Sequence, residues 1–398
     1  MHIKISAVTF GDEEIEEAIS CLRSAKLTMG ARCLAFEKAF AEYLGAGNAI
    51  FVNSGSSANL LSWFAISNPM IPERQGRRRL GPGTEVIVPA VSWSTTIWPI
   101  VQAGCVPVLV DCDPDTLQMN LDAVKAAIGP KTGAICVIHA MGNATPMAPV
   151  VSLAAEHGLW LVEDTCEALG TRHGGRYTGC FGQIGTFSFY FSHHISTIEG
   201  GMAVTDDDEI ADLLRSMRSH GWSRHRTDRD AIERRYPEID PRFLFITTGF
   251  NLRPTELNGA FGLRQLPKLS TFNRRRKEIG KAWHEAFTVL VEAGKLSVMR
   301  TTEDTEPAFF GYPVLCRSSA EKDKLMRFLE EKGIETRPII CGNMARQPAF
   351  EHVSHRVAGS LAGADRIMDT GLYWGVHPRI TDEEVDYVGN TVRSFFAA

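Results

Sequence analysis

Residues 49–65 read Ala-Ile-Phe-Val-Asn-Ser-Gly-Ser-Ser-Ala-Asn-Leu-Leu-Ser-Trp-Phe-Ala, and this stretch sets the pattern of the fold. An apolar run of strand length is followed by a turn of small residues and then by a helical run. Similar apolar runs recur at residues 85–88, 106–110, 134–138, 159–162, 186–190 and 202–205. Such runs are typical of buried strands in a parallel sheet that is covered on both faces. Their alternation with helical patterns predicts an α/β fold with a mostly parallel, seven-stranded sheet.

The pattern changes after about residue 265. A long helical stretch toward residue 291 is followed by a strand at 312–316, a helix at 318–332 and a final helix after residue 381. We therefore predict a large α/β domain over residues 1–265 and a smaller C-terminal α+β domain over residues 266–398.

The composition of the 398-residue chain argues against several classes of protein. The net charge of −5 disfavours a nucleic-acid-binding protein, which normally carries a basic excess. We find neither a signal-peptide pattern nor an apolar run long enough to span a membrane. The nine cysteines are scattered without a Cys-x-x-Cys pair, which argues against a disulfide framework or a zinc ribbon. We expect a cytoplasmic enzyme.

The turn at residues 53–59, Asn-Ser-Gly-Ser-Ser-Ala-Asn, is a candidate anion site. Small residues between a strand and a helix allow backbone N–H groups to approach a phosphate at the positive end of the helix. A tight turn without a ligand is the alternative. Residues 161–167, Leu-Val-Glu-Asp-Thr-Cys-Glu, place Asp164 at the end of another strand, where ligands bind in open α/β sheets. There the carboxylate could pair with a protonated ring nitrogen, or it could cap a helix.

Two consecutive histidines, His193 and His194, follow an aromatic run and precede a Gly-Gly turn. Adjacent strand residues point to opposite faces of a sheet, and no matching His or Cys cluster lies nearby, so we do not expect a metal site. A polar pair within a loop is the alternative. Trp93, at the exit of another strand, either packs in the core or stacks on an aromatic ligand.

Two charge-rich stretches, at residues 74–79 and 224–235, are most simply solvated loops. The second stretch could instead help to bind an anionic substrate.

These segments, together with residues 28–37 (Thr-Met-Gly-Ala-Arg-Cys-Leu-Ala-Phe-Glu) and 249–256 (Gly-Phe-Asn-Leu-Arg-Pro-Thr-Glu), resemble the DegT/DnrJ/EryC1/StrS sugar aminotransferases. These proteins have the aspartate aminotransferase-like fold type I and use pyridoxal 5′-phosphate (PLP) on nucleotide-linked keto-sugars. The resemblance implies a cofactor phosphate held by Gly55, Ser56 and Ser188. It further implies that Trp93 stacks on the pyridine ring, that Asp164 pairs with its nitrogen and that Glu167 lies near its 3-hydroxyl. Asn251 would reach the phosphate in the neighbouring subunit, which implies a homodimer.

The departure from the family pattern concerns the lysine that forms a Schiff base with PLP. In most members this lysine lies six residues before the Glu-Gly-Gly turn, and here that position is His193. No lysine lies between Lys131 and Lys268. Because an imidazole cannot form an imine, we expect PLP or its amine form, pyridoxamine 5′-phosphate (PMP), to bind non-covalently. The segments around Trp93 and His193 resemble a subgroup, the 3-dehydratases that make 3,6-dideoxysugars.

This subgroup contains two kinds of enzyme. One kind acts on cytidine-linked sugars and carries a cysteine-ligated 2Fe–2S cluster. The other acts on GDP-4-keto-6-deoxymannose without a cluster, takes its amine from L-glutamate and serves colitose synthesis. A cluster needs several closely placed thiolates, whereas no cysteine lies between Cys180 and Cys316. The resemblance is therefore to the enzyme without an iron–sulfur cluster.

The resemblance also implies the chemistry. A base removes a proton from the C4′ carbon of the cofactor, and the electrons expel the C3 hydroxyl of the sugar. His193 is the candidate base, because an imidazole takes and gives protons near neutral pH. His220 and Arg224 are candidate contacts to the sugar or its pyrophosphate, although Arg224 could simply be solvated. Two other functions stay open: a nucleotide-sugar aminotransferase, and a non-catalytic sensor that binds the cofactor or the sugar.

Overall fold

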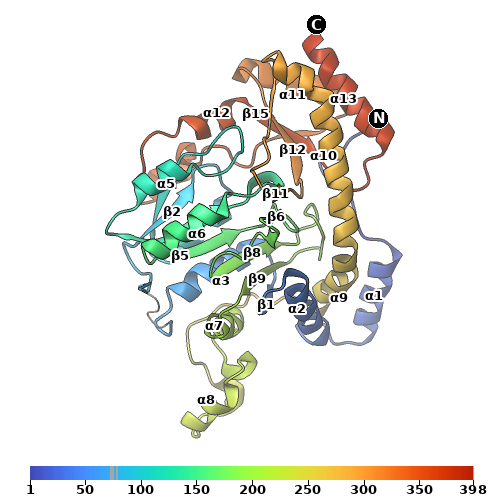
Figure 1. Cartoon of the computed structure of the whole chain (residues 1–398). Coiled ribbons are helices and arrows are strands. Elements are labelled where there is room, and N and C mark those ends of the chain that lie inside the picture. The colour runs from blue at the N-terminus through green and yellow to red at the C-terminus, as the bar shows by residue number, and fades with distance from the viewer. Residues whose placement is uncertain (72–75, 78, 398) are drawn as a thin grey trace.

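An eight-stranded sheet, in the order β1-β9-β8-β5-β4-β2-β3-β14, forms the centre of the large domain (Figure 1). Strand β9 is antiparallel to both of its neighbours, and all other neighbours pair in parallel. The bounds of the strands are β1 Asn48–Val52, β2 Glu85–Pro89, β3 Val106–Val110, β4 Thr132–Ile138, β5 Trp160–Asp164, β8 Ile184–Ser188, β9 Gly201–Thr205 and β14 Arg356–Val357.

The predicted α/β class with a mostly parallel sheet is confirmed, and all seven predicted strands are present. The predicted strand count is corrected by β14, a two-residue strand from the C-terminal part of the chain that pairs with β3. The computed structural model describes residues 1–71, 76–77 and 79–397, so residues 74, 75 and 78 of the first predicted charged loop lie outside the described residues.

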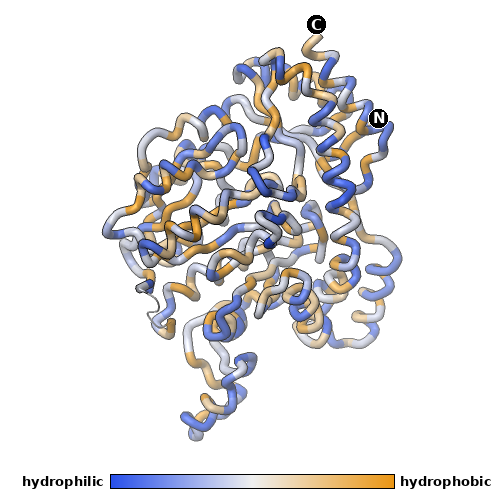
Figure 2. Tube along the Cα trace, viewed as in Figure 1, coloured by the Kyte–Doolittle hydropathy of each residue, from blue (hydrophilic) through white to orange (hydrophobic). Residues whose placement is uncertain are grey.

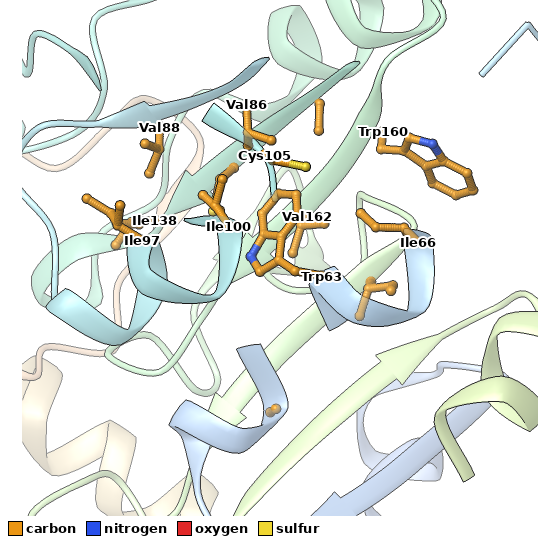
Figure 3. Packing of buried hydrophobic residues seen from close by; sticks show 14 of the residues in the cluster. Trp63, Ile66, Val86, Val88, Ile97, Ile100, Cys105, Ile138, Trp160 and Val162 are labelled. Atoms are coloured by element: carbon orange, nitrogen blue, oxygen red, sulfur yellow. The ribbon is translucent and has the colours of Figure 1, made fainter. Parts of the chain in front are cut away.

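Helices cover both faces of this sheet. The helices of this part of the chain are α1 Asp12–Arg23, α2 Ala31–Leu44, α3 Gly55–Ile66, α4 Ser94–Gln102, α5 Leu121–Ala127, α6 Met147–Glu156, α7 Asp208–Arg218, α8 Arg229–Arg235 and α9 Glu256–Gln265. Val86 and Val88 pack with α3 and α4 on one face (Figure 3), whereas Ile87 packs with α5 and α6 on the other. Because successive side chains enter two different cores, the strands are almost continuously apolar.

The C-terminal part of the chain forms an antiparallel sheet in the order β10-β12-β15-β13. A third, small sheet, β11-β6-β7, joins this part to the large domain. The bounds are α10 Leu269–Glu292, α11 Ser319–Glu331, α12 Ala362–Thr370, α13 Asp382–Ala397, β6 Arg172–His173, β7 Arg176–Tyr177, β10 Ser297–Val298, β11 Thr305–Glu306, β12 Gly311–Leu315, β13 Thr336–Pro338 and β15 Gly371–Gly375. Short 3-10 helices are η1 Ala140–Gly142, η2 Ser223–His225, η3 Pro241–Phe243, η4 Leu266–Lys268, η5 Met344–Arg346 and η6 Pro348–His352.

The second charge-rich stretch differs from the predicted loop. Residues 224–235 form most of η2 and then α8, which projects from the body of the molecule and is mostly hydrophilic (Figures 1 and 2). An i,i+4 pair between Arg229 and Glu233, with an N···O distance of 2.6 Å, lies on this helix. Charge alone therefore marked the segment as solvated but did not reveal that it is helical.

The buried carboxylate of Glu256 joins the two motifs at residues 28–37 and 249–256. It accepts hydrogen bonds from the main-chain N–H groups of Gly30, Arg32 and Cys33, at 2.7, 3.0 and 3.1 Å. These donors lie at the start of α2 and have no partner within the helix, so Glu256 caps it.

None of the described helices combines the length and the apolar content needed to cross a membrane.

Candidate active site

The predicted site residues of the large domain gather at one edge of the sheet. Strand β1 leads into Gly55, β5 ends at Asp164 and β8 ends at Ser188. These three strands run in the same direction, because β9 is antiparallel to both β1 and β8 and β8 is parallel to β5. Their carboxyl ends therefore meet at the edge where ligands bind in open α/β sheets.

Gly55 starts α3 in close contact with β8. A Cβ atom at this position would lie 2.6 Å from Cβ of Ser188 and 3.1 Å from Sγ of Cys166. Only glycine therefore allows the first turn of α3 to approach Ser188 this closely. The predicted neighbourhood of Gly55 and Ser188 is present, with main-chain N–H groups at the positive end of a 12-residue helix.

Ser56 and Trp93 lie at the starts of two neighbouring helices. The Ser56 hydroxyl is 2.8 Å from the hydroxyl of Thr95, in the first turn of α4. Trp93 is the N-cap of α4, and 56% of its surface is exposed. This tryptophan does not pack in the core, so the second alternative, stacking on a ligand, stays open.

Asp164 is buried and held by three hydrogen bonds. Its Oδ2 accepts from Asn59 Nδ2 at 2.8 Å and from Thr96 Oγ1 at 2.7 Å, and its Oδ1 accepts from the Cys166 N–H at 3.1 Å. Among the described residues no helix starts at Asp164 or Thr165, so the helix-cap alternative is wrong. The carboxylate is instead fixed in one orientation, as recognition of a charged ligand atom requires.

Glu167 lies near Asp164 and is half-buried. Its Oε2 accepts from the Met141 N–H at 2.9 Å, a donor aimed by the left-handed backbone of Met141, whose φ is 57°. Burial raises the pKa of Glu167 to about 7, and the charge of Asp164 adds to this rise, whereas the hydrogen bond from Met141 opposes it. Glu167 can therefore hold or release a proton near neutral pH.

His193 follows β8 in a turn, outside the strands. Its Nδ1 lies 2.7 Å from the carbonyl oxygen of Cys166, and because a carbonyl only accepts, Nδ1 carries the proton of this bond. Burial lowers the pKa of His193 to about 4, while the Cys166 carbonyl and Asp164 oppose this shift. The neutral ring therefore leaves a lone pair on Nε2, which makes that atom a base.

The remaining three predicted residues, His220, Arg224 and Asn251, lie around Trp222 and not at the sheet edge. Cζ of Arg224 lies 4.3 Å from the centroid of the Trp222 ring. The ring centroid of His220 lies 4.8 Å from the same point. Arg253 connects them to Asn251, because it donates to Asn251 Oδ1 at 3.0 Å and lies 3.3 Å from His220 Nε2. The three predicted residues thus form one basic, aromatic surface.

A main-chain bond connects this surface to the sheet edge. The N–H of Asn53, two residues before Gly55, donates to the carbonyl of Leu252 at 3.0 Å. Several large apolar side chains from segments of the site are exposed, namely Trp93, Tyr190, Phe191 and Phe245.

Several residues that build the site were missed. Asn59 and Thr96 hold Asp164, and Thr186 in turn donates to Asn59 Oδ1 at 2.6 Å. Asn59 and Thr96 lie near the starts of α3 and α4, so a polar residue in the first turns of the helix after a strand is the signal that could have found them, whereas Thr186 lies within β8. The signal was absent for Met141 and for Phe310, whose ring centroid lies 5.1 Å from that of His193.

No metal-ligand cluster marks this site among the described residues. A cavity of about 710 Å³ lies elsewhere, between α10 and residues 297–313, and no predicted site residue lines it. Among all the residues that the structure describes, no group of three or more His, Cys, Asp and Glu side chains could hold a metal ion. The geometry instead offers a helix N-terminus, an oriented carboxylate and a base.

Comparisons with known proteins agree with this geometry. The sequence model of the DegT/DnrJ/EryC1/StrS aminotransferase family matches residues 9–393. The chain is 34% identical, over 399 residues, to GDP-4-keto-6-deoxy-D-mannose 3-dehydratase from Yersinia pseudotuberculosis, covering 99% of this chain and 98% of that protein. It is 35% identical, over 408 residues, to dTDP-4-dehydro-2,6-dideoxy-D-glucose 3-dehydratase from Saccharopolyspora spinosa, covering 99% of this chain and 87% of the relative.

A solved structure is similar over nearly the whole chain. The crystal structure of a GDP-4-keto-6-deoxymannose-3-dehydratase with a trapped PLP–glutamate geminal diamine superposes with a TM-score of 0.88 at 32% sequence identity. The match covers 98% of this chain and 100% of the other. The predicted fold type I architecture is therefore confirmed.

Proposed function

The chain belongs to the DegT/DnrJ/EryC1/StrS aminotransferase family, and on this premise we propose that it is a PLP- and PMP-dependent nucleotide-sugar 3-dehydratase. In this proposal the enzyme removes the C3 hydroxyl of a GDP-4-keto-6-deoxyhexose, with GDP-4-keto-6-deoxy-D-mannose as the first candidate. The product is the 4-keto-3,6-dideoxy sugar.

The observation that carries this proposal is the histidine at position 193. The family lysine is replaced, and the ring that replaces it is oriented by Cys166 so that Nε2 is free to accept a proton. With no lysine between Lys131 and Lys268, the usual covalent attachment of PLP has no candidate in this part of the chain. An enzyme with a base but no imine-forming amine is suited to proton transfer, and its cofactor can stay in the amine form.

The sheet edge fits the chemical groups of PLP. The close approach of the α3 N-terminus to Ser188, which a Cβ at Gly55 would prevent, suits a phosphate, and the exposed hydroxyl of Ser56 adds a donor. The fixed carboxylate of Asp164 suits a protonated ring nitrogen. We propose that these residues hold the cofactor, that Trp93 covers its ring and that Glu167 contacts its 3-hydroxyl.

The residues then have distinct roles in the reaction. When bound, PLP supplies an electron sink next to the carbon that loses its proton. Nε2 of His193 accepts that proton, because Nδ1 is already bonded to Cys166, and the protonated ring can pass it to the departing C3 hydroxyl. Asp164 keeps a proton on the ring nitrogen by its negative charge.

The overall reaction balances with glutamate as the amine source. The C3 oxygen of the sugar leaves as water and one water is consumed by hydrolysis, so no net water is formed; the amino group of L-glutamate ends as ammonia, and its carbon skeleton becomes 2-oxoglutarate. The two electrons that replace the C3–oxygen bond by a C3–hydrogen bond come from glutamate. No iron–sulfur cluster is needed, which agrees with the scattered positions of the cysteines.

We further propose a homodimer with shared active sites. Exposed aromatic side chains, including Trp93 and Phe245, leave apolar surface that a second copy would cover. Asn251 lies on the surface around Trp222, next to Arg253, and can contact an anion in the partner. His220 and Arg224, on the same surface, are the proposed contacts to the sugar or its pyrophosphate.

Product mass tests the proposal directly. The purified protein is incubated with PLP, L-glutamate and separate GDP-, dTDP- and CDP-linked 4-keto-6-deoxysugars, and the products are analysed by mass spectrometry. We expect loss of one oxygen atom from a GDP-linked sugar, with 2-oxoglutarate formed in equal amount. Replacement of the ketone oxygen by an amine would instead identify an aminotransferase. Binding of cofactor or sugar without turnover would identify the non-catalytic sensor.

A further inference from the structure

The second histidine of the pair, His194, has no role in the proposed chemistry, yet it is completely buried. Its Nε2 lies 2.8 Å from the carbonyl oxygen of Ala308, so this nitrogen carries a proton and donates it to the main chain. Its Nδ1 is buried and has no hydrogen-bond partner among the residues that the structure describes. Burying a polar atom without a partner costs free energy of folding. Because the protein nevertheless keeps this ring buried, we infer that the bond from Nε2 to Ala308 has a specific use.

Ala308 begins a segment, residues 308–310, that the large domain also holds from the other side. The Ala308 N–H lies 3.1 Å from the Gly142 carbonyl and 3.0 Å from Thr171 Oγ1, and the Phe310 N–H donates to the Met141 carbonyl at 3.2 Å. A Cβ at Gly142 would lie 1.9 Å from the Ala308 oxygen, so the two segments are in direct main-chain contact.

Arg276, a buried residue of α10, holds the same segment from the C-terminal domain. Its Nη1 donates to the Phe309 carbonyl at 3.0 Å and lies 3.4 Å from the Phe310 carbonyl. The segment is thus fixed by both domains, and His194 is the side chain that connects it to the loop carrying the catalytic base.

Together these bonds to residues 308–310 form a clamp, and this clamp fixes the position of Phe310. Its ring centroid lies 5.1 Å from that of His193 and 6.1 Å from that of His194. Cys166 fixes only one atom of the His193 ring, which leaves rotation about that hydrogen bond open. The Phe310 ring, packed beside the imidazole, restricts this rotation.

We propose that His194 is a positioning residue: its bond to Ala308 holds the Phe310 ring against His193 and so keeps Nε2 of His193 directed at the reacting carbon. This inference rests on the proposed function for the identity of the reaction, but the clamp itself is a property of the protein without substrate. It gives the consecutive histidines separate tasks, one in proton transfer and one in orientation.

Two variants of similar volume separate the bond from the packing. His194→Leu removes the donor, whereas His194→Gln keeps an N–H near the position of Nε2. We expect kcat of His194→Leu to fall about 10- to 100-fold with KM for the sugar unchanged, because a misplaced base lowers the rate without weakening binding. His194→Gln should recover most of this loss. Phe310→Leu should lower kcat by a similar factor, and the double variant should be no slower than either single variant.

A readout without turnover completes the test. In long-range 1H–15N spectra of the 15N-histidine-labelled holoenzyme, with His193 assigned from His193→Asn, the wild type should show a proton fixed on Nδ1. His194→Leu should shift or broaden the Nε2 resonance of His193, because the ring can then rotate about its bond to Cys166, and His157→Gln, a change at an exposed histidine, should not. Unchanged kcat and an unchanged Nε2 resonance of His193 in His194→Leu would overturn the proposal, as would a His194→Gln variant that is equally slow. If His194→Leu does not fold, Phe310→Leu decides. If the wild type has no dehydratase activity, the proposed function fails, and the Nε2 resonance still tests the clamp.

Discussion

The bond between Nδ1 of His193 and the Cys166 carbonyl determines which nitrogen of the ring is the base. His193→Asn can preserve this bond through its amide N–H while removing Nε2. We therefore expect deoxygenation at C3 to fall by at least about 10²-fold with the affinity for PLP unchanged. Product mass measures the first quantity and equilibrium dialysis the second. His157→Asn, at an exposed histidine, is the control, and retained deoxygenation in His193→Asn would exclude His193 as the base.

The main-chain N–H of Met141, which donates to Glu167, should report the titration of this carboxyl group. Its pKa is raised to about 7 by burial, so it gains charge between pH 6 and 8, and the hydrogen bond from Met141 strengthens as it does. In 15N-methionine-labelled protein, the amide resonance of Met141, assigned from Met141→Leu, should shift with a midpoint about pH 7. Glu167→Gln should abolish that shift. A Met141 resonance that does not respond to pH in the wild type would contradict the prediction.

At the scale of elements, the approach of α3 to β8 depends on the absence of one side chain. Gly55→Ala places a Cβ 2.6 Å from that of Ser188, and this contact must push the first turn of α3 outward. Because that turn is the proposed phosphate site, we expect the dissociation constant for PLP to rise about 10-fold or more. Gly129→Ala is the matched control, since a Cβ there meets nothing within 4 Å. Equal PLP affinity in both variants would show that the α3 N-terminus is not the phosphate site.

Elements with strong apolar patterns could be predicted from the sequence, and those defined by distant contacts could not. The seven long strands of the large sheet carry enough apolar residues to be recognised, and the small-residue turn at Gly55 follows the first of them. Strand β14, by contrast, has two residues and exists only because β3 presents an open edge. Phe310 is distant in sequence from His193, so no local pattern connects them. Residues at a strand end and its turn could thus be placed from the sequence, whereas Phe310, from the C-terminal part of the chain, and Met141, with its left-handed backbone, could not.

At the scale of the molecule, histidines with a lowered pKa should make stability depend on pH. Burial lowers the pKa of His193, His225 and His377 to about 4, and it lowers that of His194 well below its usual range. In the unfolded chain these rings bind protons below about pH 6.5. Between that pH and about pH 4 the unfolded state therefore holds more protons, and folding becomes less favourable as the pH falls.

Glu167 opposes this trend, because its raised pKa lets the folded state hold an extra proton between about pH 4.5 and 7. The histidines outnumber this single carboxyl. We therefore expect the free energy of unfolding, measured with urea, to decrease steadily from pH 6.5 to 5, by up to about 1.4 kcal/mol per pH unit for each net proton. Stability that is constant or rises over this interval would contradict the buried, neutral state of these histidines.

Strand β14 has a consequence for how the protein is made. A ribosome releases the N-terminal strands of the large sheet long before it reaches Arg356, so β3 emerges as an edge with unpaired N–H and C=O groups. The nascent chain must carry this open edge until most of the C-terminal domain has been translated. Folding of the large sheet is thus completed only near the end of synthesis, and the unfinished sheet is exposed to pairing with other chains. Chaperone demand should accordingly be greatest while the chain is still attached and β14 has not yet emerged.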